Sequence, residues 1–402
     1  MPDRPDETLR RFGRNSVALL VSDVAGRLLT AAFRVALAGY LGRELFGAWS
    51  FAMAVAMVIG VLADLGLATL VTREVARRPG SPFDVAGPAM SARLLLLLPT
   101  GGLALLLLFV TGDSPAVLSL TAILLGTQAI LAPGEILAAA HRGRERMVRP
   151  AAATVVTRAG FVLSGFVAMA LGAGVHVFAA LAVAWAIPLV LLLRPGLPGR
   201  LRPIVRGCLP VLRRALPIGL GTVLWTIYFR LDLVLLGILR GEGEVGLYSA
   251  PFSIVEAVLL LQGPLLAAAF PVLSRETGGR RTYRLTVRLL AAGGLVAAGV
   301  LVVGRGAILS RLFGPAYAGA ETVLLLLALT IPVSALAAPR LMRLVARDGE
   351  RVYARIMGAG LAANLVLDLA LIPTWGAAGA AVATLATECL VTALTFIVPR
   401  RS

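Results

Sequence analysis

Lysine is absent from this 402-residue sequence, and acidic side chains are few. All 38 basic residues are arginine, against 21 Asp and Glu, so the formal net charge is +17. Charged residues make up 15% of the chain, whereas about 25% is usual for a soluble domain. A chain of this length needs a polar exterior to fold in water, and these residues are too few to build one. The composition therefore excludes a water-soluble globular protein.

Cysteine and histidine are also scarce. The two cysteines, Cys208 and Cys389, lie far apart in or beside apolar segments, which supports neither a disulfide framework nor a metal site. His141 lies in a basic loop and His176 at an expected helix end, positions typical of interfacial residues rather than of ligands or bases. No P-loop and no G-x-G-x-x-G motif opens a helix. We therefore predict no metal, no cofactor and no catalytic residues.

Long apolar segments dominate what is present. Hydrophobic residues make up 58% of the chain and the mean hydropathy is +0.89. Segments of about twenty apolar residues recur, and each is long enough to cross about 30 Å of hydrocarbon. The polar start leads directly into a full-length span, so no cleavable signal peptide is expected. We predict an all-α membrane protein of about twelve transmembrane helices, at 16–40, 46–72, 88–111, 116–139, 150–172, 176–193, 209–238, 246–273, 284–304, 319–341, 353–373 and 377–398.

The arginines predict the orientation of these spans. Thirty of them fall at the termini and in alternate loops, whereas the opposite loops hold only four. Because loops rich in arginine stay in the cytoplasm, we expect a multi-pass protein of the cytoplasmic membrane with both termini inside. The arginines are spread over short loops instead of forming one basic stripe, which argues against binding of nucleic acid.

The chain divides near its middle. The longest connection rich in proline and arginine, 194–210, separates two halves whose first predicted outer loops end alike, as Gly-Ala-Trp-Ser at 47–50 and Gly-Leu-Tyr-Ser at 246–249. Parallel repeats of this kind are known among transporters. We expect two six-helix bundles, an N-terminal one over 1–203 and a C-terminal one over 204–402.

The first predicted span carries a polar stripe. Asp23, Arg27, Thr30 and Arg34 follow one another at spacings of four, three and four, so they lie along one side of a helix. A charge at the bilayer centre costs about 2.5–3.5 kcal/mol and needs a partner or a water-filled cavity. A local pair of Asp23 with Arg27 would neutralise part of the stripe but would leave Arg34 unexplained. We therefore expect the stripe to face a central cavity.

The arginines within the spans indicate an anionic substrate. A guanidinium binds phosphate bidentately and keeps its charge in a poorly hydrated site. Arg27, Arg34 and Arg230, with Thr30 beside them, are therefore the predicted substrate-binding residues for a group such as a diphosphate.

The acidic residues within the spans leave two roles open. They could line the cavity, or they could bind H⁺ or Na⁺ as a coupling ion; the candidates are Asp23, Asp64, Asp232 and Glu256. A later set is expected to form hydrogen bonds between helices rather than to contact substrate: Asn364, Asp368, Thr384, Glu388, Thr392 and Thr395.

Several segments carry a family resemblance, and they run through almost the whole chain. They include YLGRELFGAWSF at 40–51, DLGLATLVTREVAR at 64–77, YFRLDLVLLG at 228–237 and LIPTWGAAGAA at 371–381. With these, the chain resembles the Wzx-type polysaccharide (oligosaccharide) flippases of the multidrug/oligosaccharidyl-lipid/polysaccharide exporter superfamily. The chain is short for that family and has no extra pair of C-terminal helices, which argues against the fourteen-helix lipid II flippase branch.

The resemblance implies a V of two bundles around a central cavity. It also implies a function: moving undecaprenyl-diphosphate-linked oligosaccharide, or a related lipid-linked glycan, across the membrane by alternating access. Glycan polymerase or glycosyltransferase machinery would be the partners, beside membrane lipids. In the family, cavity charges come largely from the first two helices of each bundle. That implication falls here on Asp23, Arg27, Arg34, Asp64, Arg230, Asp232 and Glu256.

Three other functions compete with that of a flippase. A multidrug or cation antiporter of the same superfamily would have acidic and aromatic cavity walls, and the arginines weigh against it. A glycan polymerase or ligase would need a sizeable outer loop, which the short loops do not provide. A non-transporting membrane component of a glycan-assembly complex stays open. We predict a lipid-linked glycan flippase that is not an enzyme.

Overall fold

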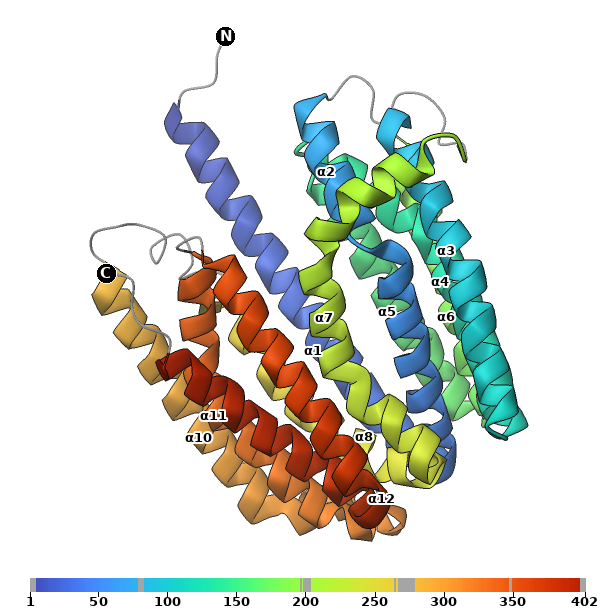
Figure 1. Ribbon diagram of the computed structural model, residues 1–402, viewed down its shortest axis with the longest axis vertical. Helices are drawn as coiled ribbons and strands as arrows, with labels where there is room; N and C mark the ends of the chain where they lie inside the picture. Colours follow the sequence, from blue (N-terminus) through green and yellow to red (C-terminus); the bar gives the residue numbers. More distant parts are fainter. Residues whose placement is uncertain are drawn as a thin grey trace.

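The protein is helical throughout the part of the chain that the structure describes, and no strand occurs there (Figure 1). The predicted all-α class is confirmed. The computed structural model describes residues 5–78, 83–195, 197, 204–263, 265–266, 279–346 and 349–397, without the side chains of 5–25, 27, 83, 279–280 and 350.

Ten segments of the described chain are long and apolar enough to cross a membrane, judged by length and composition. In the first half the helices are α1 (Pro5–Asp64), α2 (Leu67–Arg77), α3 (Phe83–Val110), α4 (Pro115–Gly143), α5 (Val148–Ala170) and α6 (Val175–Leu193). In the second half they are α7 (Cys208–Arg240), α8 (Glu242–Leu260), α10 (Gly279–Leu312), the short 3₁₀ helix η1 (Pro315–Ala320), α11 (Glu321–Val345) and α12 (Glu350–Ile397).

Two of these helices are too long for one crossing. α1 has 60 residues and α12 has 48, and at 1.5 Å per residue either one greatly exceeds the roughly 30 Å of a hydrocarbon core. Each contains a glycine with non-helical dihedral angles, Gly42 at φ 74° and Gly376 at φ 56°. Only glycine adopts such angles without steric cost. The short loops predicted around 41–47 and 373–376 are therefore kinks between two helices.

A side chain of α8 stabilises the kink at Gly376. The backbone N–H of Ala377 donates to the Glu244 carboxylate of α8 at 2.7 Å. A helix start leaves backbone N–H groups without partners, and here Glu244 accepts from one of them.

A second interruption lies inside the predicted span 46–72. α1 ends at Asp64 and α2 begins at Leu67, and both residues between them have left-handed dihedral angles, with φ 41° at Leu65 and 85° at Gly66. A positive φ is a steric outlier for leucine, so neighbouring contacts must hold this break in place.

The two halves meet along α1, α7 and α8. In Figure 1, α3, α4 and α6 lie on one side of the molecule and α10 to α12 on the other. α1 packs against α3, α4 and α5 of its own half and against α7 and α8 of the other half. α7 also contacts α2 and α3. Residues on α1 are therefore positioned to interact with both halves.

Glycines bring the backbones of the halves into direct contact. A Cβ added to Gly47 would overlap the carbonyl oxygen of Glu242, and one added to Gly246 would overlap that of Arg43. We call this contact between α1 and α8 the glycine seam. Only helices without side chains at the crossing can approach so closely.

Candidate functional site

Three charged residues from both halves form one cluster, which we call the central triad: Arg34 of α1, Arg230 of α7 and Glu256 of α8. Nη1 of Arg34 pairs with Oε2 of Glu256. Nη2 of Arg230 pairs with Oε1 of the same carboxylate at 3.0 Å. Each oxygen of Glu256 thus receives one guanidinium, and the triad keeps one excess positive charge.

The members of the central triad differ in exposure. The side chains of Arg230 and Glu256 are 10% and 11% exposed, whereas that of Arg34 is 25% exposed. Arg230 also lies over the ring of Phe229, at 5.2 Å from its centroid. Burying a charge is costly unless it is paired, so the shared carboxylate stabilises both arginines. Arg34 is the member that remains most accessible.

Of the other residues in the predicted polar stripe on α1, the structure describes the side chain of Thr30. The hydroxyl of Thr30 donates to the carbonyl of Gly26 at 2.8 Å, within its own helix. Thr30 is half-buried and lies one turn before Arg34. The backbone of Asp23 and Arg27 belongs to α1, but their side chains lie outside the described residues.

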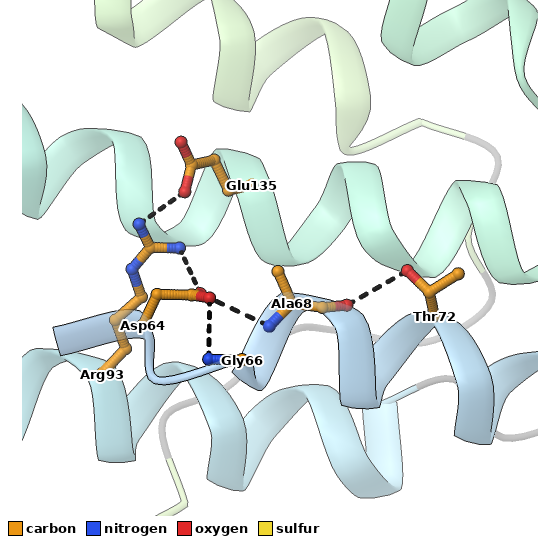
Figure 2. Close-up of polar contacts among 6 residues, drawn as sticks. All are labelled: Asp64, Gly66, Ala68, Thr72, Arg93 and Glu135. Carbon is orange, nitrogen blue, oxygen red and sulfur yellow. Dashed lines mark hydrogen bonds and ion pairs between the residues drawn. The ribbon is translucent and has the colours of Figure 1, made fainter. Parts of the chain in front are cut away.

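A second cluster lies inside the first half (Figure 2). Arg93 of α3 pairs through Nη1 with Oδ1 of Asp64 at 3.0 Å and through Nη2 with Oε2 of Glu135 of α4 at 2.5 Å. Its side chain is 4% exposed. Arg93 is not among the predicted site residues, yet it is buried within α3. We call this group the Arg93 cluster.

Asp64 in the Arg93 cluster also holds the break between α1 and α2. Its Oδ2 accepts the backbone N–H of Gly66 at 3.2 Å, and its Oδ1 accepts that of Ala68 at 3.3 Å, as Figure 2 shows. A carboxylate at a helix start satisfies free N–H groups there. Both oxygens of this predicted cavity acid are thus occupied by structural contacts.

A third cluster joins α7, α8 and α12 of the second half. Oδ2 of Asp232 accepts from the hydroxyl of Tyr248 at 2.6 Å and from that of Thr384 at 2.7 Å. Asp368 is fully buried and lies within interaction range of Asp232. Among the described residues, no donor group reaches either oxygen of Asp368 or Oδ1 of Asp232, so these two carboxyls face one another. We call these four residues the acidic cluster.

Comparison with known proteins places the chain in a family. The family described as "Polysaccharide biosynthesis protein" matches residues 12–276, which is more than half of the chain. The chain belongs to the polysaccharide biosynthesis protein family. A curated relative, the Escherichia coli (strain K12) protein named "Putative O-antigen transporter", is 22% identical over 408 residues and covers 97% of each chain.

Two solved structures have the same fold as this family member. The lipid II flippase MurJ in an inward closed conformation gives a TM-score of 0.74 at 14% identity, covering 94% of this chain and 87% of that one. An inward-facing multidrug resistance MATE family transporter of the MOP superfamily gives 0.73 at 16% identity, covering 92% and 93%. The chain is thus a multi-pass membrane protein with a transporter fold, and its family and neighbours are transporters and flippases rather than enzymes.

In this polysaccharide biosynthesis protein, the expected hydrogen bonds between helices are found for several residues of the later polar set. Thr384 reaches Asp232 of α7, Glu388 accepts from the hydroxyl of Tyr228 at 2.8 Å, and Thr392 donates to the carbonyl of Val333 of α11 at 3.3 Å. Asp368 interacts with the carboxyl of Asp232 across the same helix contact. The side-chain oxygen of Asn364 has no partner among the described residues.

The charge balance of each cluster limits what it can bind. The central triad has one cation in excess, so it is suited to an anion. Two adjacent buried carboxyls such as Asp232 and Asp368 cannot both ionise unless a cation or a shared proton offsets them. The acidic cluster in this family member is therefore suited to a proton or a small hard cation that prefers oxygen ligands.

Proposed function

We propose that the protein is a flippase that moves a lipid-linked oligosaccharide across the cytoplasmic membrane by alternating access. The cargo we propose is an undecaprenyl-diphosphate-linked glycan. Glycosyltransferases and a glycan polymerase that act on the same lipid-linked glycan are the expected partners. Membership of the polysaccharide biosynthesis protein family and similarity to an O-antigen transporter support this class of cargo.

The central triad is the observation that carries the proposal. Arg34 and Arg230 share one carboxylate inside the apolar part of the molecule, which leaves one positive charge. A guanidinium forms paired, charge-assisted hydrogen bonds with phosphate oxygens. The diphosphate is the one invariant charged group of such a cargo, so we assign it to Arg34 and Arg230. Arg27 and Thr30 extend the same side of α1.

We further propose that the chain crosses the membrane twelve times. The kinks at Gly42 and Gly376 divide α1 and α12 into two spans each, which turns ten apolar segments into twelve. The bundles are then 1–203 and 204–402, arranged as a V with the glycine seam at its closed, extracytoplasmic end. An even number of crossings agrees with both termini in the cytoplasm.

The acidic cluster is our candidate for the coupling ion. Asp232 of α7 and Asp368 of α12 present buried carboxylate oxygens that no described donor reaches, and the hydroxyl of Thr384 and the amide oxygen of Asn364 both belong to α12. Oxygen ligands of this kind bind H⁺ or Na⁺. Asp64 is the weaker candidate, since its oxygens are engaged by Arg93 and by backbone N–H groups.

The same acidic cluster favours one alternative function, a multidrug or cation antiporter of the superfamily. A buried carboxyl pair could exchange a cationic substrate for protons. The excess positive charge at the central triad would repel such a substrate, so this function is the second choice.

The test is glycan export in a strain that lacks the chromosomal gene. Single Arg34→Ala and Arg230→Ala variants should abolish surface glycan while the protein remains in the membrane at normal amounts. The matched control is Arg305→Ala, which breaks a half-exposed pair with Glu321 far from the triad along the chain. Normal export by both triad variants would refute the proposal. A periplasmic reporter fused after Arg206 should be inactive, and its activity would overturn the orientation.

A further inference from the structure

Glu256 links the two halves of the molecule. Its Oε2 pairs with Arg34 of the first half, and its Oε1 pairs with Arg230 of the second at 3.0 Å. The carboxylate is therefore bound to the same two guanidiniums that we assign to the cargo diphosphate. α8, which carries it, also forms the glycine seam with α1.

A carboxylate and a phosphate compete for the same donors. Both accept paired hydrogen bonds from the planar fork of a guanidinium. A diphosphate adds at least two negative charges to a site whose net charge is one positive. If Glu256 stayed in contact, three or more negative charges would share two arginines in a poorly hydrated region, where like charges repel strongly. Diphosphate binding and the contact between Glu256 and Arg34 therefore oppose each other.

The two ion pairs of Glu256 have different mechanical consequences. The pair with Arg230 joins neighbouring helices of one half, so it can persist when the halves move. The pair with Arg34 joins the halves and must break when they separate at this level. Arg34 is also the more exposed arginine, at 25% against 10% for Arg230, so an entering head group reaches it first.

We propose that Glu256 is an internal substitute for the anion of the cargo. In the empty carrier it binds Arg34 and holds the halves together; the diphosphate displaces it from Arg34, binds the two arginines through its two phosphates, and so lets the halves take a wider separation. Glu256 is then a positioning residue that links cargo binding to the movement of the halves. This inference rests on the proposed function, because it requires Arg34 and Arg230 to bind the cargo.

The experiment measures diphosphate binding and the separation of the halves in one purified protein. Cys208 and Cys389 are replaced by serine, and spin labels are placed at two exposed helix starts, Val148 of α5 and Arg351 of α12, one in each half. Farnesyl diphosphate is titrated into the protein in nanodiscs, with farnesol as the uncharged control. The readouts are the Kd and the distribution of distances between the labels.

In the parent protein, farnesyl diphosphate should shift the distance distribution saturably and farnesol should not. Glu256→Gln should already show the shifted distribution without ligand. It should also bind farnesyl diphosphate about tenfold more tightly, if the contact with Glu256 leaves about one tenth of the empty carriers ready to bind. The matched control Glu321→Gln removes a carboxylate from the half-exposed pair with Arg305 and should change neither readout.

The outcomes separate the two proposals. If the parent protein fails to bind farnesyl diphosphate, the proposed function fails and this inference fails with it. If the parent binds it in an Arg34-dependent manner but Glu256→Gln has the parent's Kd and distances, the inference alone is overturned. Should Glu256→Gln not fold, Glu256→Asp, which keeps the charge but shortens its reach, should show a smaller shift in the same directions. Parent values in that variant would count against the inference.

Discussion

The central triad and the Arg93 cluster are built from the same chemical groups in opposite proportions. The triad has two arginines and one acid and connects the halves, whereas the Arg93 cluster has one arginine and two acids and lies within the first half. In the Arg93 cluster Arg142 of α4 lies within electrostatic range of both acids and offsets the surplus negative charge, and Asp64 also accepts backbone N–H groups at the break between α1 and α2. In the triad two guanidiniums share one carboxylate, and we propose that a bound anion offsets the remaining positive charge.

The largest expected effect is that of Arg93→Ala. The change would leave Asp64 buried without its cation and remove the tie from α3 to the helix break. Removing one partner of a buried ion pair typically costs about 3–5 kcal/mol. We expect loss of folded protein in the membrane, measured by thermal unfolding in detergent. A variant as stable as the parent would show that the Arg93 cluster does not hold the break.

A smaller and different effect is expected for Arg34→Lys. Lysine keeps the charge but loses the planar fork that binds phosphate bidentately. A charge-assisted hydrogen bond is worth about 1.5–3 kcal/mol, so glycan export should fall at least about tenfold while thermal stability stays near that of the parent. Unchanged export would mean that a point charge is enough at the triad. That result would mean that the central triad behaves as a structural ion pair and not as a phosphate-binding site.

Asp232→Asn should uncouple transport from the proton or sodium gradient that drives it. The variant keeps the hydrogen bonds of Tyr248 and Thr384 but removes one charge from the acidic cluster. We expect transport that no longer responds to an imposed proton or sodium gradient, with a stability change of about 1 kcal/mol or less because the site becomes less charged. Transport in proteoliposomes with each gradient applied separately gives the measurement. A full response to either gradient would show that the acidic cluster has no role in ion coupling.

The smallest effect is expected for Glu135→Gln. Its side chain is 45% exposed, although it pairs with Arg93 at 2.5 Å, and exposed ion pairs contribute about 0–1 kcal/mol. The amide can still accept a hydrogen bond from Arg93. Thermal unfolding should shift by no more than a few degrees. A loss as large as that of Arg93→Ala would mean that both acids of the Arg93 cluster matter equally.

Much of this fold follows from the sequence, because length and hydropathy determine where a helix can cross a membrane. The stripe spacing on α1 likewise singled out Arg34, and the cost of an intramembrane charge singled out Arg230 and Glu256. That these three meet could not be predicted, since Arg34 and Glu256 are 222 positions apart. Only the packing of α1 on α8 brings them together.

The structural roles of some residues could not be predicted from hydropathy and charge patterns. Arg93 follows a run of loop arginines, and neither charge nor hydropathy distinguishes a buried guanidinium from an interfacial one at a span end. Leu65 has a left-handed φ that its residue type disfavours, so the break appears only once Asp64 and Arg93 are seen around it. Asp368 was expected to form hydrogen bonds within the bundle. Its place beside the carboxyl of Asp232, without a donor from the described residues, is a property of the three-dimensional arrangement and has no local signal.

The glycine seam also has a consequence for the membrane potential. A gap too narrow for one Cβ is too narrow for a file of water molecules, so no proton can be relayed across the contact between Gly47 and Gly246. The membrane potential acts on every carrier with about 2.3 kcal/mol per elementary charge per 100 mV. For the flippase that we propose, the glycine seam would therefore block proton leakage between the two halves at this contact while the carrier holds no cargo.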